Sequence, residues 1–336
     1  MDTLTHIVLG ACIGEAIAGK KLGKKALFLG AFANSIPDLD FVASFWLPTT
    51  RDLLAHRAFT HSFLFVLLIT PLLAYLSRWI FKKQNLSLKH WLLFWGVEVF
   101  VHIFIDAFNA YGTAWFEPFS HYRVSFNTIY VADPLFSIWP ALAFISLLII
   151  KKDSLKRNFW VNIGLITSSI YLFLGILFKQ SIEYDVRYSL TKQHKTYYRN
   201  FTTPTPLNNL LWYTVAESDS GFYIGYRSLF DHQPNMKFHY DAKNRHLLEN
   251  TTNKEDADNL IKFSNGYYTA DMWHDTLVFN ILRFGEMNGW NEEQPRCAFH
   301  YFLDQPENNK MIVQRGRFAG WNRESLWLFL KRIKGV

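Results

Sequence analysis

Histidine and acidic side chains lie in or beside the apolar segments of this 336-residue chain, where a charge is costly. A charged side chain at the centre of a membrane helix costs about 2.5–3.5 kcal/mol, so each one needs a partner. Imidazole and carboxylate groups bind Zn²⁺ and similar cations, and a bound cation offsets their desolvation. The candidate metal ligands are His6, Asp38, His56, His61, His102, Asp106 and Asp133.

The local spacing predicts that several of these residues face a common point. His102 and Asp106 are four residues apart, so both lie on one face of a helix, and Glu98 lies one turn earlier on that face. Asp38 and Asp40 follow a proline, which breaks a helix and frees the local backbone. We therefore expect a bend with two carboxylates beside a stripe of Glu, His and Asp.

Residues near these ligands have side chains suited to proton transfer and to anion binding. A carboxylate that does not bind the metal, Asp40 or Glu98, is the candidate general base. The guanidinium of Arg57, together with that of Arg123, can hold a phosphate or carboxylate in a bidentate contact. Among the candidates, His61, His102, Asp106 and Asp38 are expected to bind first, and His6 or Asp40 would complete one or two divalent cations. Zn²⁺ suits the histidines and Mn²⁺ or Mg²⁺ suits the carboxylates. Such an ion lowers the pKa of a bound water and so generates hydroxide.

The segments that carry these residues are apolar, and some are long enough to cross a membrane, which takes about 20 helical residues. The predicted apolar stretches are residues 5–19, 26–47, 62–81, 91–111, 134–150 and 159–178. The first is short and the second is broken by a proline, so these two are expected to form a tilted or re-entrant pair. We predict an α-helical polytopic membrane bundle of about five to six spans over residues 1–180.

Basic loops predict the orientation of this bundle. Lysine-rich clusters at residues 20–25, 82–89 and 151–157 occupy alternate loops, and the positive-inside rule places them in the cytoplasm. All candidate ligands then lie at the outward ends of their segments. We therefore predict a multi-pass protein of the bacterial cytoplasmic (inner) membrane with an extracytoplasmic C-terminal domain.

The same residues can also have structural roles that involve no catalysis. Buried polar side chains can join membrane helices through hydrogen bonds without a metal. Asp40 can cap a helix, His56 can orient a ligand, and Asp133 precedes a proline, as at an ordinary helix start. Ionisable residues distributed across the full thickness of a membrane would indicate an ion pathway. Here they gather at one end of their segments, which favours an enzyme over a transporter.

Composition excludes several other classes of protein. Half of the residues are hydrophobic and 19% are charged, which is too apolar for a disordered chain. The net charge of +7 is concentrated in short clusters of the apolar half, a pattern typical of membrane topology signals and not of a nucleic-acid surface. The two cysteines form no disulfide framework and no metal-binding pair.

From about residue 181, short aromatic and β-branched runs separated by turn sequences predict a mixed, mostly antiparallel β (α+β) soluble domain over 181–336, closed by an amphipathic helix at 323–334.

Taken in chain order, the motifs resemble one known family. They are Thr5-His6, Pro37-Asp38-x-Asp40, His56-Arg57-x2-Thr60-His61-Ser62, His102-x3-Asp106, Tyr111-Gly112-Thr113, Pro118-Phe119-Ser120 and Asp133-Pro134. This pattern resembles the bacterial membrane-bound metal-dependent hydrolases of YdjM type, whose better-known members are regulated by LexA, and the resemblance covers about residues 1–140. It implies an integral membrane protein with divalent-metal hydrolase activity. Where the resemblance leads us to expect a basic pair, this chain has His121-Tyr122-Arg123.

These features together predict an integral membrane metal-dependent hydrolase. A metal-activated water would attack a lipid-linked or membrane-proximal ester. A guanidinium at the bilayer edge favours a phosphoester or another small anionic substrate, and carboxylic esters and amides stay open. The expected partners are the lipid bilayer and this substrate, with no nucleic acid. The alternatives are an ion- or proton-coupled transporter, and a membrane binding or regulatory protein in which the His/Asp cluster is structural.

Overall fold

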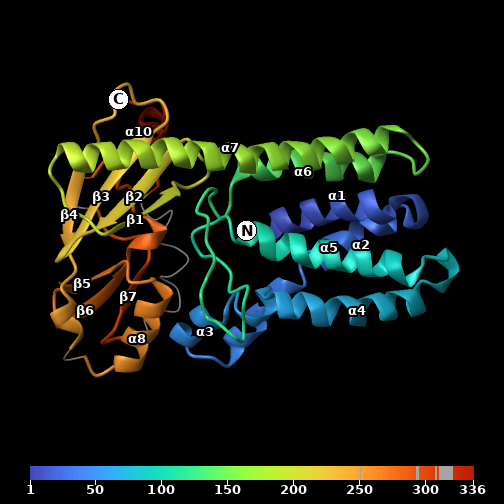
Figure 1. The fold of residues 1–336 in the computed structure, drawn as a ribbon, viewed down its shortest axis with the longest axis horizontal. Helices are drawn as coiled ribbons and strands as arrows, with labels where there is room; N and C mark the ends of the chain where they lie inside the picture. Colours follow the sequence, from blue (N-terminus) through green and yellow to red (C-terminus); the bar gives the residue numbers. More distant parts are fainter. Residues whose placement is uncertain (250, 293–294, 307–308, 310–320) are drawn as a thin grey trace. The chain divides into compact units, whose positions relative to one another are not determined.

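The computed structural model describes residues 1–249, 251–292, 295–306, 309 and 321–336, drawn as a coloured ribbon in Figure 1. Its residues form two units, Met1–Phe45 with Ala55–Gly175, and Trp46–Leu54 with Ile176–Val336. The first unit is helical and the second contains antiparallel sheets, as predicted for the fold class. The assignment of a hydrolase domain to residues 1–180 and of a separate domain to 181–336 stays a prediction.

Helices build the first unit, and polar residues define where they begin. They are α1 (Thr3–Leu22), α2 (Lys24–Ala33), α4 (Phe63–Ile80), α5 (Leu88–Asp106), α6 (Pro134–Ile149) and the first part of α7 (Lys156–Lys192), with the short 3₁₀ segments η1 (Pro37–Phe45), η2 (Phe59–His61) and η3 (Lys82–Gln84). The Ser62 and Ser87 side chains accept hydrogen bonds from the amides of Phe65 and His90. Each cap satisfies a donor that the first turn of a helix leaves unpaired.

Glycines let α1 and α2 pack closely. A Cβ atom added at Gly10 would lie 2.5 Å from the carbonyl oxygen of Gly30, and one added at Gly14 would lie 2.9 Å from the Cα of Gly30. Both separations are far inside van der Waals contact, so no larger residue fits without movement. Close backbone approach through small residues is typical of helix pairs in membranes. Because α2 leads into the break that carries Asp38 and Asp40, this packing helps to fix the position of both carboxylates.

Three helices, α4, α5 and α7, are long and apolar enough to cross a membrane. Helices α2 and η1 meet at 51° and would form a fourth, broken span or a re-entrant loop. The predicted interruption of the second apolar stretch is therefore present. Among the described residues, three spans are supported, or four with the bent pair, and the predicted five to six are not confirmed. Helix α1 carries the acidic Glu15, and α6 has only 16 residues.

Helix α7 has 37 residues and continues well past residue 178, where the sixth apolar stretch was predicted to end. Beyond that point Ile182, Val186 and Leu190 recur every four residues and are buried. They pack against Trp212 and Ala216 of the sheet. The predicted start of the soluble domain at residue 181 therefore lies inside a helix. Its apolar stripe was missed because charged and polar residues separate the three apolar positions.

Two antiparallel sheets form the second unit. Strands β1 (Arg199–Pro204), β2 (Leu211–Glu217), β3 (Gly221–Ser228) and β4 (Phe238–Ala242) pair in that order, with β4 at an edge. Strands β5 (Tyr268–Trp273), β6 (Thr276–Ile281) and β7 (His300–Phe302) form the second sheet. The remaining elements are α8 (Lys254–Phe263), η4 (Arg245–Leu248), η5 (Leu282–Phe284) and α10 (Arg323–Ile333). Helix α10 coincides with the predicted amphipathic helix.

The connection between Asp40 and His56 contains the short helix α3 (Thr49–Ala55), and residues Trp46–Leu54 belong to the second unit. The Thr50 hydroxyl donates to Asp256 Oδ1 on α8 at 2.5 Å. Arg51 Nε lies 2.6 Å from Glu255 Oε1 on the same helix. The segment between Asp40 and His56 is therefore attached to α8 by a hydrogen bond and an ion pair.

Candidate metal centre

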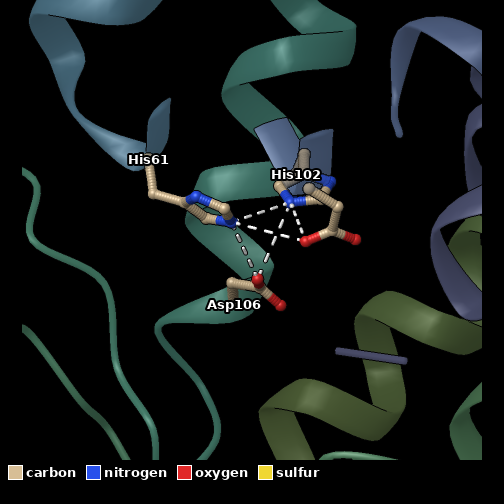
Figure 2. Close-up of side chains that lie close together, drawn as sticks. His61, His102 and Asp106 are labelled. Carbon is tan, nitrogen blue, oxygen red and sulfur yellow. Dashed lines mark hydrogen bonds and ion pairs between the residues drawn. The ribbon is translucent and has the colours of Figure 1, made fainter. Parts of the chain in front are cut away.

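Side chains from three elements converge in the first unit. Asp38 lies on η1, His61 on η2, and His102 and Asp106 on α5. One donor atom from each of the four lies within 4.8 Å of those of the others. Figure 2 shows the imidazoles of His61 and His102 turned toward each other, with the Asp106 carboxylate beside both. All four residues are among the seven candidate ligands of the sequence.

The separations between these donor atoms suit a tetrahedral cation. His61 Nε2 and His102 Nε2 are 3.1 Å apart. Asp38 Oδ1 lies 3.6 Å from His61 Nε2 and 3.5 Å from His102 Nε2. Asp106 Oδ2 lies 3.3 Å and 3.6 Å from the same two nitrogens. A tetrahedron with metal–ligand distances of about 2.0–2.1 Å has edges of about 3.3–3.4 Å. Five of the six edges thus suit Zn²⁺ or an ion of similar size, and the sixth, between the two carboxylates, is at most 4.8 Å.

Further contacts orient both imidazoles with Nε2 toward the centre. His102 Nδ1 contacts the carbonyl oxygen of Asn34. His61 Nδ1 lies 3.0 Å from Thr60 Oγ1 and 3.5 Å from Asp40 Oδ2. A carbonyl or carboxylate on the far nitrogen is the usual partner of a metal-binding imidazole. When Nδ1 carries the proton and donates it outward, Nε2 keeps the lone pair that a cation needs.

Solvent reaches the four-residue group mainly beside Asp38. The side chains of His61, His102 and Asp106 are fully buried, whereas 19% of the Asp38 side chain is exposed. Asp106 Oδ2 accepts no hydrogen bond from any described residue and lies 3.1 Å from Arg57 Nε. The guanidinium offsets part of this buried charge, and a bound cation would give Oδ2 the close partner that it lacks.

His6 flanks the centre and is not one of the four converging residues. Its ring stacks on that of His102 with 3.7 Å between the centroids. Its Nε2 lies 3.2 Å from Asp106 Oδ1, and its Nδ1 lies 3.1 Å from Asn34 Oδ1. The role of His6 as a ligand stays a prediction, and its contacts suit it to orient His102 and Asp106.

Asp40 and His56 form a second layer next to His61. Asp40 Oδ1 lies 3.0 Å from His56 Nδ1. Asp40 Oδ2 accepts hydrogen bonds from the Arg57 amide at 2.7 Å and from the Thr60 hydroxyl at 3.2 Å. The His56 side chain is 38% exposed. Asp40 therefore connects a candidate ligand, His61, to an imidazole that reaches solvent.

The two arginines contact protein groups. The Arg57 guanidinium donates to Asn109 Oδ1 at 3.2 Å and to the Met1 carbonyl at 3.0 Å. The φ angle of Arg57 is 58°, a left-handed conformation that costs a non-glycine residue about 1–2 kcal/mol and that clusters at functional sites. Arg123 donates to the carbonyl of His56 at 2.6 Å. The anion-binding role of both arginines stays a prediction.

Glu98 and Asp133 lie outside the four-residue group. Glu98 is buried on α5, and its Oε2 accepts a hydrogen bond from Asn34 Nδ2 at 3.1 Å. Asp133 caps α6 by accepting from the Leu135 amide at 3.0 Å, and it also accepts from the Tyr171 hydroxyl at 2.8 Å. This cap matches the structural alternative for an Asp-Pro pair. No hydrogen bond or ion pair in the described part of the chain joins Asp133 to another candidate ligand.

Asn34 is a residue of the centre that the sequence did not reveal. It is fully buried, and its carbonyl contacts His102 while its side chain contacts His6 and Glu98. The available signal was an amide side chain inside an apolar stretch, four residues before Asp38. A search restricted to ionisable side chains passes over an amide, although its two polar ends can hold two neighbours at once.

Known proteins resemble the first half of the chain. The profile of a family described as "YdjM inner membrane protein" matches residues 1–182. The "Uncharacterized protein YfhP" of Bacillus subtilis (strain 168) is 33% identical over 174 residues, which cover 45% of this chain and 51% of that protein. The "Inner membrane protein YbcI" of Escherichia coli (strain K12) is 27% identical over 122 residues, 36% of this chain and 69% of that protein. The chain thus spans about half the length of the Bacillus relative, and no solved structure matches it.

Proposed function

The chain belongs to the YdjM inner membrane protein family, and from this premise we propose that it is an integral membrane metal-dependent hydrolase. Asp38, His61, His102 and Asp106 would hold a divalent cation. The observation that supports this function best is the spacing of their donor atoms, 3.1–3.6 Å over five pairs. Hydrogen bonding alone does not require four ligand atoms at the corners of one tetrahedron.

Two imidazoles and two carboxylates favour Zn²⁺, with Mn²⁺ as the alternative, and they disfavour Mg²⁺ because it prefers oxygen ligands. When bound, the ion would supply an activated water as the nucleophile. Asp40 lies outside the four ligands and is the candidate general base, and it would act through the ring of His61, whose Nδ1 it contacts on the side away from the centre. A proton taken up at Asp40 can pass to His56, which is hydrogen-bonded to it and partly exposed. Glu98, buried one turn before His102, is the other candidate base.

The proposed substrate is a lipid-linked or membrane-proximal ester, with a phosphoester favoured. The family and the three long apolar helices support a membrane location. The partly exposed Asp38 and His56 mark the side from which a substrate can approach. The buried positive charge of Arg57 lies next to Asp106 and would stabilise negative charge that develops near the ion. A multi-pass topology with an extracytoplasmic C-terminal domain is part of the same proposal.

Removal of the metal is expected to abolish hydrolysis, and its return is expected to restore it. The test uses full-length protein in mild detergent, stripped with a chelator and reloaded with Zn²⁺ or Mn²⁺. Release of nitrophenol is followed from a nitrophenyl phosphate monoester, a phosphate diester and a carboxylic ester. Hydrolysis that continues at full rate in protein shown by mass spectrometry to be metal-free would contradict the proposed function.

Asp40→Asn is expected to lower kcat by about 10–100-fold while most of the metal is retained. The amide keeps the size of the side chain, but it cannot accept a proton and weakens the contact with His61. KM should change little, because Asp40 is not a proposed substrate contact. The matched control is Asp153→Asn, the same chemical change on an exposed loop. A variant with normal kcat and an unchanged pH profile would remove Asp40 from the mechanism.

A further inference from the structure

A second group of possible cation ligands lies in the second unit, far along the chain from the first. His239 and Asp241 are two residues apart on β4, so their side chains share one face of the sheet. Glu286 follows η5 and forms an isolated bridge with Cys297. One donor atom from each of His239, Asp241 and Glu286 lies within 4.8 Å of the other two.

Glu286 is a buried carboxylate with only part of its charge offset. Its side chain is fully buried, its Oε1 lies 2.9 Å from His239 Nε2, and its Oε2 accepts from the Tyr226 hydroxyl at 2.9 Å. Burial raises the pKa of Glu286, and burial also raises the pKa of Asp241. Burial lowers the pKa of His239, but the hydrogen bond and charge of Glu286 outweigh it, and the net shift is upward. Two carboxylates thus share one imidazole, and a divalent cation would offset both.

A buried tyrosine lies on the same face of the sheet as His239. Tyr213 on β2 is directly opposite Tyr226 on β3, and their rings are 5.3 Å apart. Tyr226 is two residues from the strand partner of His239, so these side chains share one face. The Tyr213 hydroxyl is buried and makes no hydrogen bond to a described residue. Burial raises the pKa of Tyr213 well above its usual value, and the negative charges of Glu286 and Asp241 add to this effect.

Gly289 brings the backbone into close contact with Glu286. A Cβ atom added at Gly289 would collide with Glu286 Oε2 and with the Tyr226 hydroxyl. The backbone therefore approaches the carboxylate as closely as glycine allows. Gly289 and Tyr226 together fix the position of the Glu286 carboxylate beside His239.

We propose that His239, Asp241 and Glu286 form a second divalent-cation site, which binds Zn²⁺ or Mn²⁺ through one imidazole nitrogen and two carboxylate oxygens. Mixed nitrogen and oxygen donors suit these two ions. The ion ties the edge strand β4 to the segment around Glu286, and three protein ligands leave a position for water or for the Tyr213 hydroxyl. The partly exposed His239 side chain provides the approach from solvent. This site is independent of the proposed hydrolase centre.

The test measures metal content after the first centre has been emptied. Full-length protein carrying His61→Ala and His102→Ala is loaded with Zn²⁺ or Mn²⁺ in mild detergent, desalted and analysed by mass spectrometry. We expect about one equivalent of metal in this background. Adding Asp241→Asn or Glu286→Gln is expected to lower the affinity by about tenfold or more, since each removes a charged ligand. His246→Ala, on the exposed part of η4, is the matched control and should retain the metal.

Thermal unfolding provides a second measurement in case Glu286→Gln does not fold. In the variant that carries both His61→Ala and His102→Ala, Zn²⁺ or Mn²⁺ should raise the Tm by about 5 °C. The shift should disappear with Asp241→Asn, which changes the more exposed carboxylate. A background protein that binds neither ion and shows no Tm shift would overturn the second site. So would bound metal that persists unchanged in both the Asp241 and the Glu286 variants.

Discussion

Replacing His102 with alanine is expected to empty the metal centre and to abolish hydrolysis. His102 Nε2 is one vertex of the tetrahedral donor set, 3.1 Å from His61 Nε2. Zinc binding to four-ligand protein sites is worth about 10–16 kcal/mol, so one ligand in four contributes about 2.5–4 kcal/mol. That loss lowers the affinity by about 60-fold or more. His61→Ala should have the same effect, because it removes a vertex of the same tetrahedron.

The measurement is metal content by mass spectrometry on purified protein, together with the rate of ester hydrolysis. His121→Ala is the control, because His121 lies in the same unit with its side chain 88% exposed and pairs with Glu117. It should keep both metal and activity. Wild-type metal content in both His61→Ala and His102→Ala would exclude this centre as the metal site. Loss of metal without loss of hydrolysis would instead show that the bound metal is not required for the reaction.

The helical part of this centre could be predicted because a helix determines which residues share a face. His102 and Asp106 are four residues apart, and α5 brings one donor atom of each to the same point. Asp38 and His61 lie on 3₁₀ segments, where residue spacing alone does not determine direction. The sequence grouped them with the helical pair through their shared depth. It left open whether His6 or Asp40 completes the set, since that depends on ring rotation and on contacts between distant segments.

The fold was predictable at the level of its two parts and less so in detail. Apolar stretches locate helices well, but whether a helix crosses a membrane depends on its length and its charges together. Helix α6 is apolar but only 16 residues long, and the broken pair α2 and η1 turns by 51°. Helix α7 shows the opposite error, because its amphipathic end lacks the apolarity of a span and the sequence pattern therefore predicts the start of the β domain at residue 181. Its contacts with Trp212 explain why the helix persists there.

Replacing Arg157 with methionine is expected to destabilise the protein by about 3–5 kcal/mol, because it leaves the Glu15 carboxylate buried without its partner. Arg157 Nε and NH2 lie 2.7 Å and 2.8 Å from the two carboxylate oxygens of Glu15. The two side chains are 3% and 7% exposed, respectively. This pair explains why α1 tolerates an acidic residue inside an apolar stretch. Unfolding in detergent, followed by tryptophan fluorescence, measures the change in free energy.

The double variant Glu15→Met with Arg157→Met separates the ion pair from the other contacts of Arg157. A buried pair replaced on both sides by apolar residues often costs little, so most of the single-variant loss should be recovered. Recovery should stay incomplete by about 1–3 kcal/mol, because Arg157 also donates to the carbonyls of Leu147 and Ile150 at 2.8 Å and 2.7 Å. Lys179→Met, which breaks a more exposed pair with Glu183 on α7, should cost less than about 1 kcal/mol. If Arg157→Met costs no more than this control, the pair does not hold α1 against α7, and the tolerance of Glu15 needs another cause.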